Sequence, residues 1–358
     1  MPQPISTPDD QAIDELCGAL ESRASALDSS CDWPAEQLNL CADYGVFRWF
    51  LPREWGGFEW SDLNVVRGYL RLSAACLTTT FVITQRTGAC RRILDAENAE
   101  PKSRLLHDLA AGRLFATVGI SHLTTSRRHL DRPVLAAAET SAGFMLDGYS
   151  PWVTGADHAA IVVVGATLAD GRQILVALPT DLRGVEARMP VRLTGLSASH
   201  TGELHCTNVH VGREWLLAGP RENVMAQGAG ANTGGLETST LAVGLSAAAN
   251  DGLRIEAQRR PDLVAPWQAL AVEHQALETD LLAAASGSPR CSAEQLRTRA
   301  NSHVLRATQA TLSAAKGTGY TIGHPAGRWC REALFFLVWS CPQPVIAANL
   351  CELAGLGD

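Results

Sequence analysis

Apolar residues near the N-terminus recur with the spacing of an amphipathic helix. Beyond Asp10 they stand mostly three or four positions apart, at Ile13, Leu16, Cys17, Leu20, Ala24 and Leu27. A turn-rich stretch, LPREWGGFEW at residues 51–60, interrupts the pattern, and helical spacing resumes at Asp62. Another helix is expected from Pro101 to about Gly112, because glycine is a common helix stop. The first third of the chain is therefore predicted to be helical.

Beyond residue 114 the pattern favours strands. The segments AAIVVVGAT (159–167) and QILVALP (173–179) are rich in Val, Ile and Leu, and a turn at residues 169–171 joins them. A weaker alternation over residues 203–211 closes this region. After Trp215 we expect helices to return, with apolar stripes at Leu241, Leu245, Ala249, Leu253, Leu296, Ala300, Val304 and Leu312.

The order of these blocks, helices then strands then helices, is typical of an α+β fold rather than of an alternating one. A chain of 358 residues can bury a core large enough for two or three packed units. We predict an N-terminal helical domain over residues 1–113, a central β domain over 114–216 and a C-terminal helical domain over 217–358.

The charge and the cysteines narrow the class of protein. A net charge of -7 argues against a nucleic-acid partner, because phosphate contacts need a surplus of Lys and Arg. The N-terminus lacks the basic start and apolar run of a secretory signal, and the longest bulky apolar run, residues 333–339, is too short to cross a bilayer. We therefore predict a cytoplasmic protein without a membrane partner. The ten cysteines form no CxxC pair, so neither a zinc knuckle nor a dithiol redox site is predicted.

Other local signals carry no chemistry of their own. GAGANTGG (228–235) lacks the GxGxxG spacing and no strand precedes it, so we interpret it as an entry to the next helix. The chain has no GxSxG elbow of a serine hydrolase. His200, His205 and His210 are five residues apart, so on a strand they would face alternate sides and form no metal site together.

Five segments, in their order and spacing, resemble the acyl-CoA dehydrogenase family over nearly the whole chain. They are GVFRWFLPREWGG (45–57), ATVGISHLTTS (116–126), SPWVTGADHA (150–159), LTGLSASHTGELHCTNVHV (193–211) and KGTGYTIGHPAGRWCREA (316–333). The resemblance implies an N-terminal helical domain, a central β-barrel-like domain and a C-terminal four-helix-bundle domain. It also implies bound FAD, an acyl-CoA or acyl-carrier-protein substrate, an electron acceptor, and a homodimer or homotetramer.

By the same resemblance, Trp152 is the aromatic wall against the flavin ring and Thr154 the hydrogen-bond partner of flavin N5. The alternative role for Trp152 is that of a core aromatic residue. Ser121 matches a flavin-contacting hydroxyl, and Ser126 matches a contact to the pyrophosphate. The acidic, proline- and glycine-rich loop of the family is replaced by His-Leu-Thr-Thr at residues 122–125, which is one residue shorter.

Five positions on the C-terminal helices match further cofactor contacts of the family. Arg260 matches an arginine that reaches the flavin diphosphate of a neighbouring subunit, a task that suits guanidinium geometry. Its alternative is a solvated surface arginine. His274 and Gln275 match a pair that helps to hold the cofactor. Gly317 and Gly319 match a turn whose backbone approaches the adenine half, which glycine permits.

The catalytic glutamate of the family is missing. Counting from Arg331, its position holds Ser340, and an unassisted serine hydroxyl is not a base at neutral pH. Some family members carry the glutamate elsewhere, at a position that holds Gly234 here. Glu237 lies one helical turn beyond and is the carboxylate nearest to either position, so we predict it as the catalytic base. Its alternative role is a charge that stabilises the helix N-terminus.

The function that these residues favour is an FAD-dependent oxidoreductase that desaturates an acyl thioester between its α and β carbons, with hydride transfer to flavin N5. Two alternatives remain open. A flavin-dependent monooxygenase on the same fold would need no such glutamate. A non-catalytic acyl-binding or assembly subunit would keep the fold without the chemistry.

Overall fold

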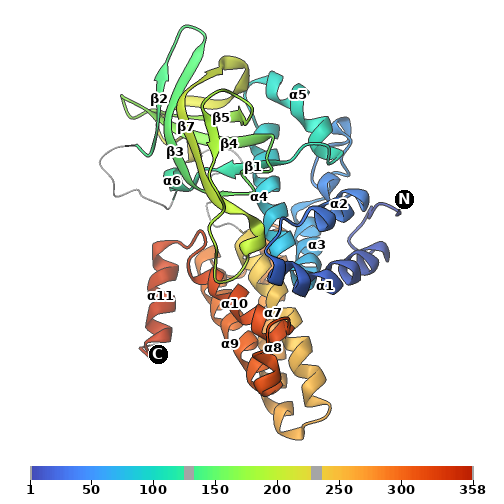
Figure 1. Ribbon diagram of the computed structural model, residues 1–358. Coiled ribbons are helices and arrows are strands. Elements are labelled where there is room, and N and C mark those ends of the chain that lie inside the picture. Colours follow the sequence, from blue (N-terminus) through green and yellow to red (C-terminus); the bar gives the residue numbers. More distant parts are fainter. Residues whose placement is uncertain (1, 125–132, 227–235, 357–358) are drawn as a thin grey trace.

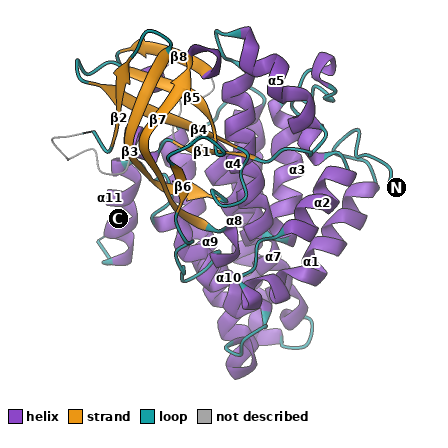
Figure 2. Ribbon diagram, turned by 45° about the horizontal axis from the view of Figure 1, so that its top comes forward, coloured by secondary structure: helices purple, strands orange, loops and turns teal. Residues whose placement is uncertain are grey.

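The computed structural model describes residues 2–124, 133–226 and 236–356, which form a helical block, a sheet and a second helical block (Figure 1). This order confirms the predicted α+β architecture. Figure 2 shows the strands gathered on one side of the molecule, with helices from both ends of the chain packed beside and below them. A site at the junction of the three parts can contain side chains from all of them.

Among the described residues, five α-helices precede the first strand. They are α1 (Ala12–Ser30), α2 (Ala35–Asp43), α3 (Asp62–Ala75), α4 (Leu77–Leu94) and α5 (Ala99–Ala110). The helices expected near Asp10, Asp62 and Pro101 are confirmed as α1, α3 and α5. The Ser61 hydroxyl caps α3 by accepting a hydrogen bond from the Asn64 backbone N–H at 3.3 Å. α4 is buried along most of its length and packs against β1, so it links the helical block to the sheet.

The described strands form one mixed sheet in the order β6-β7-β3-β2-β4-β5-β8, with β1 paired to β4. Both β1 and β2 run parallel to β4, and the other pairs are antiparallel. The bounds are β1 (Ala116–Gly119), β2 (Leu135–Glu139), β3 (Gly143–Thr154), β4 (Ile161–Leu168), β5 (Gln173–Pro179), β6 (Val185–Ala187), β7 (Thr201–Gly212) and β8 (Leu216–Arg221). The strands predicted over 159–167, 173–179 and 203–211 are confirmed as β4, β5 and β7.

One strand lies almost wholly outside the β domain predicted for residues 114–216. β8 lies directly after Trp215, where helices were expected to return, so that expectation was wrong for residues 216–221. This short segment pairs with the edge of β5 and buries Leu217 in the core. Pairing with a sheet edge satisfies its backbone groups, a tertiary effect that local hydrophobic spacing does not report.

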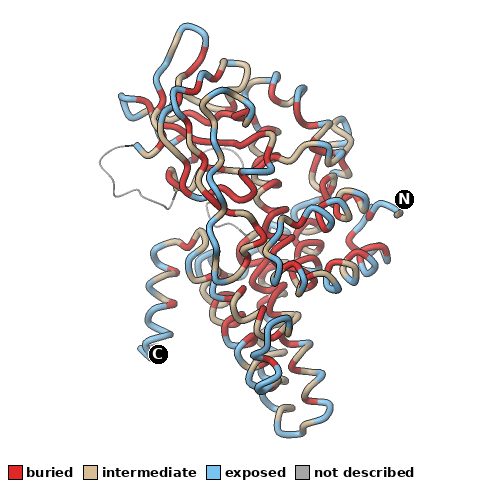
Figure 3. Tube along the Cα trace, viewed as in Figure 1, coloured by how far each residue is buried: buried red, intermediate tan, exposed pale blue. Residues whose placement is uncertain are grey.

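The C-terminal block contains α7 (Leu236–Ala257), α8 (Val264–Ala285), α9 (Ala293–Gly319), α10 (Pro325–Leu334) and α11 (Gln343–Leu353). α7 packs against α8, α9 and α10, and α8 also contacts α9. Figure 3 shows buried residues concentrated where the three parts meet, whereas α11 is mostly exposed or intermediate. In the part of the chain that the structure describes, no helix is both long and apolar enough to cross a membrane.

A close approach of α3 and α7 fixes how the two helical blocks meet. A Cβ atom at Gly244, on α7, would lie 2.7 Å from the Leu70 carbonyl oxygen and 2.5 Å from the Ser73 Cβ, both on α3. These distances are below van der Waals contact, and a backbone carbonyl cannot move aside as a flexible side chain can. Glycine at this position therefore lets the two helices approach closely.

We expect Gly244→Ala to lower the free energy of unfolding by about 1–3 kcal/mol, because the added methyl group overpacks the α3–α7 contact. Gly18→Ala is the matched control, since Gly18 lies inside α1 and a Cβ there meets nothing within 4 Å. That change should be neutral or stabilise the protein by about 0.5–1 kcal/mol, because alanine loses less backbone entropy in a helix. Urea unfolding of the two variants checks the contrast, and equal effects would contradict the close α3–α7 packing.

Candidate active site

A cavity of about 1070 Å³ lies at the junction of the helical blocks and the sheet. Its walls come from α3, α4, β1, the short helix α6 (Ser121–Thr124), β3 and α7, together with the segment around the 3₁₀ helix η8 (Phe335–Leu337). Such a volume lies at the upper end of small-molecule sites, which occur preferentially where domains meet. Four of the predicted site residues line this cavity, namely Ser121, Trp152, Thr154 and Glu237.

Trp152 presents its indole to the cavity because β3 is irregular there. Ser150 pairs with Leu204 and Val153 with Gly202, so β3 contains one extra residue between these pairs. A bulge of this kind re-aims side chains and is common beside active sites. The neighbouring Val153 is fully buried, whereas Trp152 is 47% exposed. Trp152 is therefore not a core residue, and its free aromatic surface can pack against a planar ring.

Thr154 belongs to a short chain of hydroxyl groups at the end of β3. Its Oγ1 lies 3.0 Å from Thr201 Oγ1, which lies 2.9 Å from Ser199 Oγ. Thr154 and Thr201 both line the cavity, and all three residues are buried. Because each hydroxyl can donate one hydrogen bond and accept others, the chain can orient a donor from Thr154 toward a bound group. Thr154 was predicted from the sequence and Thr201 was not, because only the β3–β7 pairing brings Thr201 opposite Thr154.

The hydrogen bonding of Ser121 shows whether the site suits a polar cofactor. Its Oγ is buried and has no hydrogen-bond partner among the described residues, although Ser121 lines the cavity. A buried hydroxyl without a partner costs about 1–3 kcal/mol, and an added donor or acceptor would remove that cost. The combination of a free aromatic face, a hydroxyl donor and an unsatisfied hydroxyl fits a flavin ring. Ser126, the other predicted serine, lies outside the described residues.

Glu237 stands in the first turn of α7 and is one of two acidic residues among the described lining residues, the other being Asp62. Burial raises the pKa of Glu237 above its usual value of 4.5, Asp62 adds to the rise, and the guanidinium groups of Arg91 and Arg92 oppose it. A carboxyl group with a raised pKa is a stronger proton acceptor once ionised, as a general base requires. The location and the pKa therefore both suit the predicted role.

Two arginines that were not predicted from the sequence also line the cavity. Arg91 and Arg92 occupy the last turn of α4, where Arg91 donates to Asp62 Oδ1 and Arg92 to the Gly88 carbonyl, both at 2.8 Å. The Nε of each is buried without a hydrogen-bond partner among the described residues. In the sequence, the only indication of this role is that two adjacent arginines lie at the end of a buried helix. They can bind an anionic group of a ligand.

Ser340 lines the same cavity, beside the aromatic residues Phe335 and Trp339. Its φ of 43° lies in the left-handed region, which residues other than glycine adopt at a cost. Gly234, at the alternative position of the family glutamate, lies outside the described residues. Ser340, at the predicted position of the family glutamate, and Glu237, the predicted base, thus border the same cavity.

The remaining predicted residues do not reach this cavity in a single chain. Arg260 follows the end of α7, whose 22 residues place it about 33 Å from the first turn. Its guanidinium donates to the Ala314 carbonyl at 2.7 Å, so it lies beside the turn that holds Gly317 and Gly319. Those three residues therefore form a group of their own at the far end of the helical block.

His274 and Gln275 lie in the middle of α8. His274 Nδ1 is 3.1 Å from Ser246 Oγ on α7, and burial lowers the pKa of His274 below its usual value. Gln275 is exposed and does not line the cavity. The structure thus brings Ser121, Trp152 and Thr154 together with Glu237, and leaves the predicted site residues of α8 and α9 apart from them.

The chain has relatives of known sequence. No protein-family model matches the chain. It is 25% identical over 272 residues to the "Probable acyl-CoA dehydrogenase YngJ" of Bacillus subtilis, which covers 72% of this chain and 70% of that protein. It is 24% identical over 164 residues to the flavin-dependent monooxygenase, oxygenase subunit HsaA, of Mycobacterium tuberculosis, which covers 46% of this chain and 38% of that protein.

The fold has solved counterparts. Butyryl-CoA dehydrogenase from Megasphaera elsdenii matches with a TM-score of 0.81 at 16% identity, over 96% of this chain and 97% of that chain. The structure of a glutaryl-coenzyme A dehydrogenase with glutaryl-CoA matches with a TM-score of 0.80 at 17% identity, over 97% and 96%. The chain is thus similar in sequence to a probable acyl-CoA dehydrogenase and shares the fold of the solved butyryl-CoA and glutaryl-CoA dehydrogenases.

Proposed function

We propose that this protein is an FAD-dependent oxidoreductase that desaturates an acyl thioester between its α and β carbons. The observation that carries the proposal is the meeting of Ser121, Trp152, Thr154 and Glu237 in one cavity. These residues come from α6, β3 and α7, and their types match the needs of a flavin and of a proton acceptor. The relationship to YngJ and the shared fold support the same class of reaction.

Each residue has a separate task in this proposal. FAD, when bound, supplies the acceptor for the hydride that leaves the β carbon. Trp152 packs against the flavin ring system, and the hydroxyls of Ser121 and Thr154 form hydrogen bonds with polar atoms of the flavin. Glu237 removes the α proton, and the burial that raises its pKa increases its basicity.

The substrate is proposed to be an acyl group carried on coenzyme A or on a carrier protein. Apolar lining residues such as Phe335, Val338 and Trp339 suit an acyl chain. Arg91 and Arg92 suit an anionic group, either a phosphate or a carboxylate of the substrate. Reoxidation requires a separate electron acceptor.

We also propose that the working form is a homodimer or a homotetramer. α8 has an apolar sequence, yet Leu277 and Leu281 are its buried residues in the single chain, and Val272 is 69% exposed. A second copy packed on this face would bury that apolar surface. In such an assembly Arg260, His274, Gln275, Gly317 and Gly319 would contact the cofactor of the neighbouring subunit.

The observation that favours a second candidate is Ser340 at the cavity, in place of the family glutamate. A flavin-dependent monooxygenase needs no base there, and HsaA is a partial sequence relative with that activity in its name. The two functions separate when the reduced protein meets oxygen. A monooxygenase consumes oxygen and inserts one atom into its substrate, whereas a dehydrogenase bleaches its flavin with the acyl thioester under anaerobic conditions.

We expect the full-length protein to bind FAD and Ser121→Ala to weaken that binding by about 0.5–1.5 kcal/mol, or up to about tenfold in Kd, because one hydrogen bond is lost. Ser150→Ala is the matched control, since its hydroxyl is also buried without a partner among the described residues but Ser150 does not line the cavity. Titration of FAD fluorescence measures both. No FAD binding, or equal losses in the two variants, would contradict the assignment of the site.

Glu237→Gln should slow anaerobic flavin reduction by a panel of acyl-CoA esters by about 100-fold or more, while FAD binding stays intact. In the unmodified protein the rate should increase as the pH rises through the raised pKa of Glu237, because ionised Glu237 is the reactive form. The variant should lack that rise. Glu256→Gln, near the opposite end of α7, controls for the change of charge. A Glu237→Gln rate within a few-fold of the original would leave Glu237 as a helix-end charge.

A further inference from the structure

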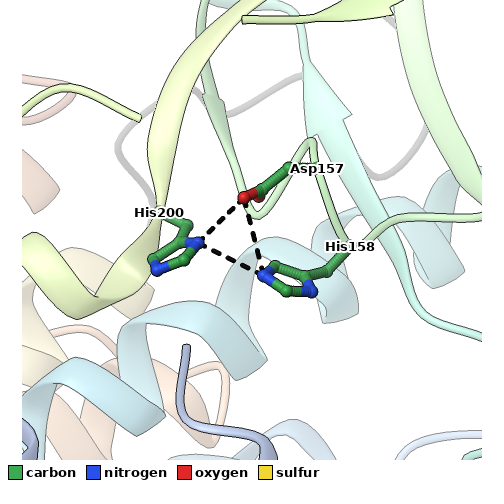
Figure 4. Close-up of side chains that lie close together, drawn as sticks. All are labelled: Asp157, His158 and His200. Carbon is green, nitrogen blue, oxygen red and sulfur yellow. Dashed lines mark hydrogen bonds and ion pairs between the residues drawn. The ribbon is translucent and has the colours of Figure 1, made fainter. Parts of the chain in front are cut away.

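Outside the cavity, three metal-binding side chains converge on one point (Figure 4). Asp157 and His158 follow the end of β3, and His200 lies directly before β7. The potential ligand atoms are one oxygen of Asp157, Nε2 of His158 and Nδ1 of His200, and they all lie within 4.8 Å of one another. His205 and His210, which follow His200 at five-residue spacing, were predicted not to form a metal site with it. In the structure His205 faces Glu203, and its Nε2 lies 2.8 Å from Glu203 Oε2.

The distances between these three atoms match the edges of a metal coordination sphere. His158 Nε2 is 3.2 Å from His200 Nδ1, Asp157 Oδ2 is 2.9 Å from His200 Nδ1, and the third edge is 3.5 Å. A zinc ion binds nitrogen and oxygen at about 2.0–2.2 Å, so two of its tetrahedral ligands stand about 3.4 Å apart. One ion can therefore contact all three atoms without a large rearrangement.

Either protons or one cation can join these three groups. A neutral imidazole carries one N–H, and an ionised carboxylate only accepts hydrogen bonds. If only His200 Nδ1 carries hydrogen, the lone pairs of His158 Nε2 and Asp157 face each other, and if only His158 Nε2 carries it, the lone pairs of His200 and Asp157 do so. If both carry it, both N–H groups can donate to Asp157 Oδ2. A divalent cation instead attracts the lone pairs of all three atoms at once.

The backbone holds the two turns in place. The Gly155 N–H donates to the carbonyls of Ser199 and His200, at 3.1 and 2.9 Å, and so joins the turn after β3 to the turn before β7. Gly155 has a φ of 63°, and a Cβ there would lie 2.5 Å from the Trp33 ring, so glycine is required. Trp33 stacks on His158, with ring centroids 4.4 Å apart and an angle of 13°. These contacts fix the ring of His158 before any ion arrives.

The access also suits an ion. All three side chains are partly exposed, so an ion can enter from solvent and water can fill a fourth position.

We propose that Asp157, His158 and His200 form a zinc-binding site. Two imidazole nitrogens and one carboxylate oxygen are ligands that zinc prefers in proteins. The ion would join the ends of β3 and β7 at Thr154 and Thr201, the paired residues whose hydroxyls line the cavity. Zinc would thus stabilise the hydroxyl chain of the active site from behind, and it would take no part in the oxidation itself.

The test uses the full-length protein, stripped with a chelator and then dialysed against micromolar zinc sulfate, followed by elemental analysis. One zinc ion per chain is expected in the unmodified protein. His158→Gln and His200→Asn should each weaken zinc binding by about tenfold or more, since changes even to outer-shell groups cost that much. His205→Asn is the control, because it removes a histidine beside a carboxylate on the same strand and should leave zinc binding unchanged.

Thermal unfolding gives a second measure, because an ion that binds only the folded state raises the Tm. Zinc should raise the Tm of the unmodified protein and of His205→Asn, and not that of the two site variants. Circular dichroism shows whether each variant is folded before the comparison is made. The proposal is overturned if the unmodified protein retains no zinc, or if folded His158→Gln and His200→Asn retain as much zinc as the control.

Discussion

The close approach of α3 and α7 is the contact on which the arrangement of the active site depends. Gly244 allows it, because any larger residue there would press on the Leu70 carbonyl. The two helices belong to the two different helical blocks, and each contributes residues to the cavity wall. Their contact therefore places Glu237, at the start of α7, within the space that β3 borders with Trp152.

A carboxylate inside such a junction is held between opposing effects. Burial disfavours its charge and raises its pKa, while Arg91 and Arg92 favour the charge. The arginines in turn have buried Nε atoms that find no partner among the described residues. A site with unsatisfied donors of this kind gains when an anionic ligand enters, because the ligand supplies the missing acceptors. The polar side of the cavity is thus arranged for a ligand rather than for the stability of the free protein.

Much of this architecture could be predicted from the sequence, and the reasons for the failures are physical. Hydrophobic spacing predicted α1, α3, β4 and β5 because each has a consistent period of its own. The resemblance to the acyl-CoA dehydrogenases pointed to Trp152 and Thr154 through the sequence motif that holds them both. β8 was not predicted because it is stabilised by pairing with the edge of β5, and not by a hydrophobic pattern in its own sequence.

The residues that were not predicted from the sequence are brought together by strand register. Thr201 lines the cavity because β7 pairs with β3 in the register that sets it opposite Thr154. The same register brings His200 next to Asp157 and His158, although more than forty positions separate them in the chain. Strand register is a tertiary property, and the five-residue spacing of the histidines could not report it.

We expect the cavity to hold FAD with its ring system against Trp152. A crystal structure of the protein grown with FAD would reveal the position of the ring. We expect density for the isoalloxazine ring on the exposed face of Trp152, with the Ser121 and Thr154 hydroxyls within hydrogen-bonding distance of its polar atoms. Flavin density at any other place, with the Trp152 face left to solvent, would contradict it.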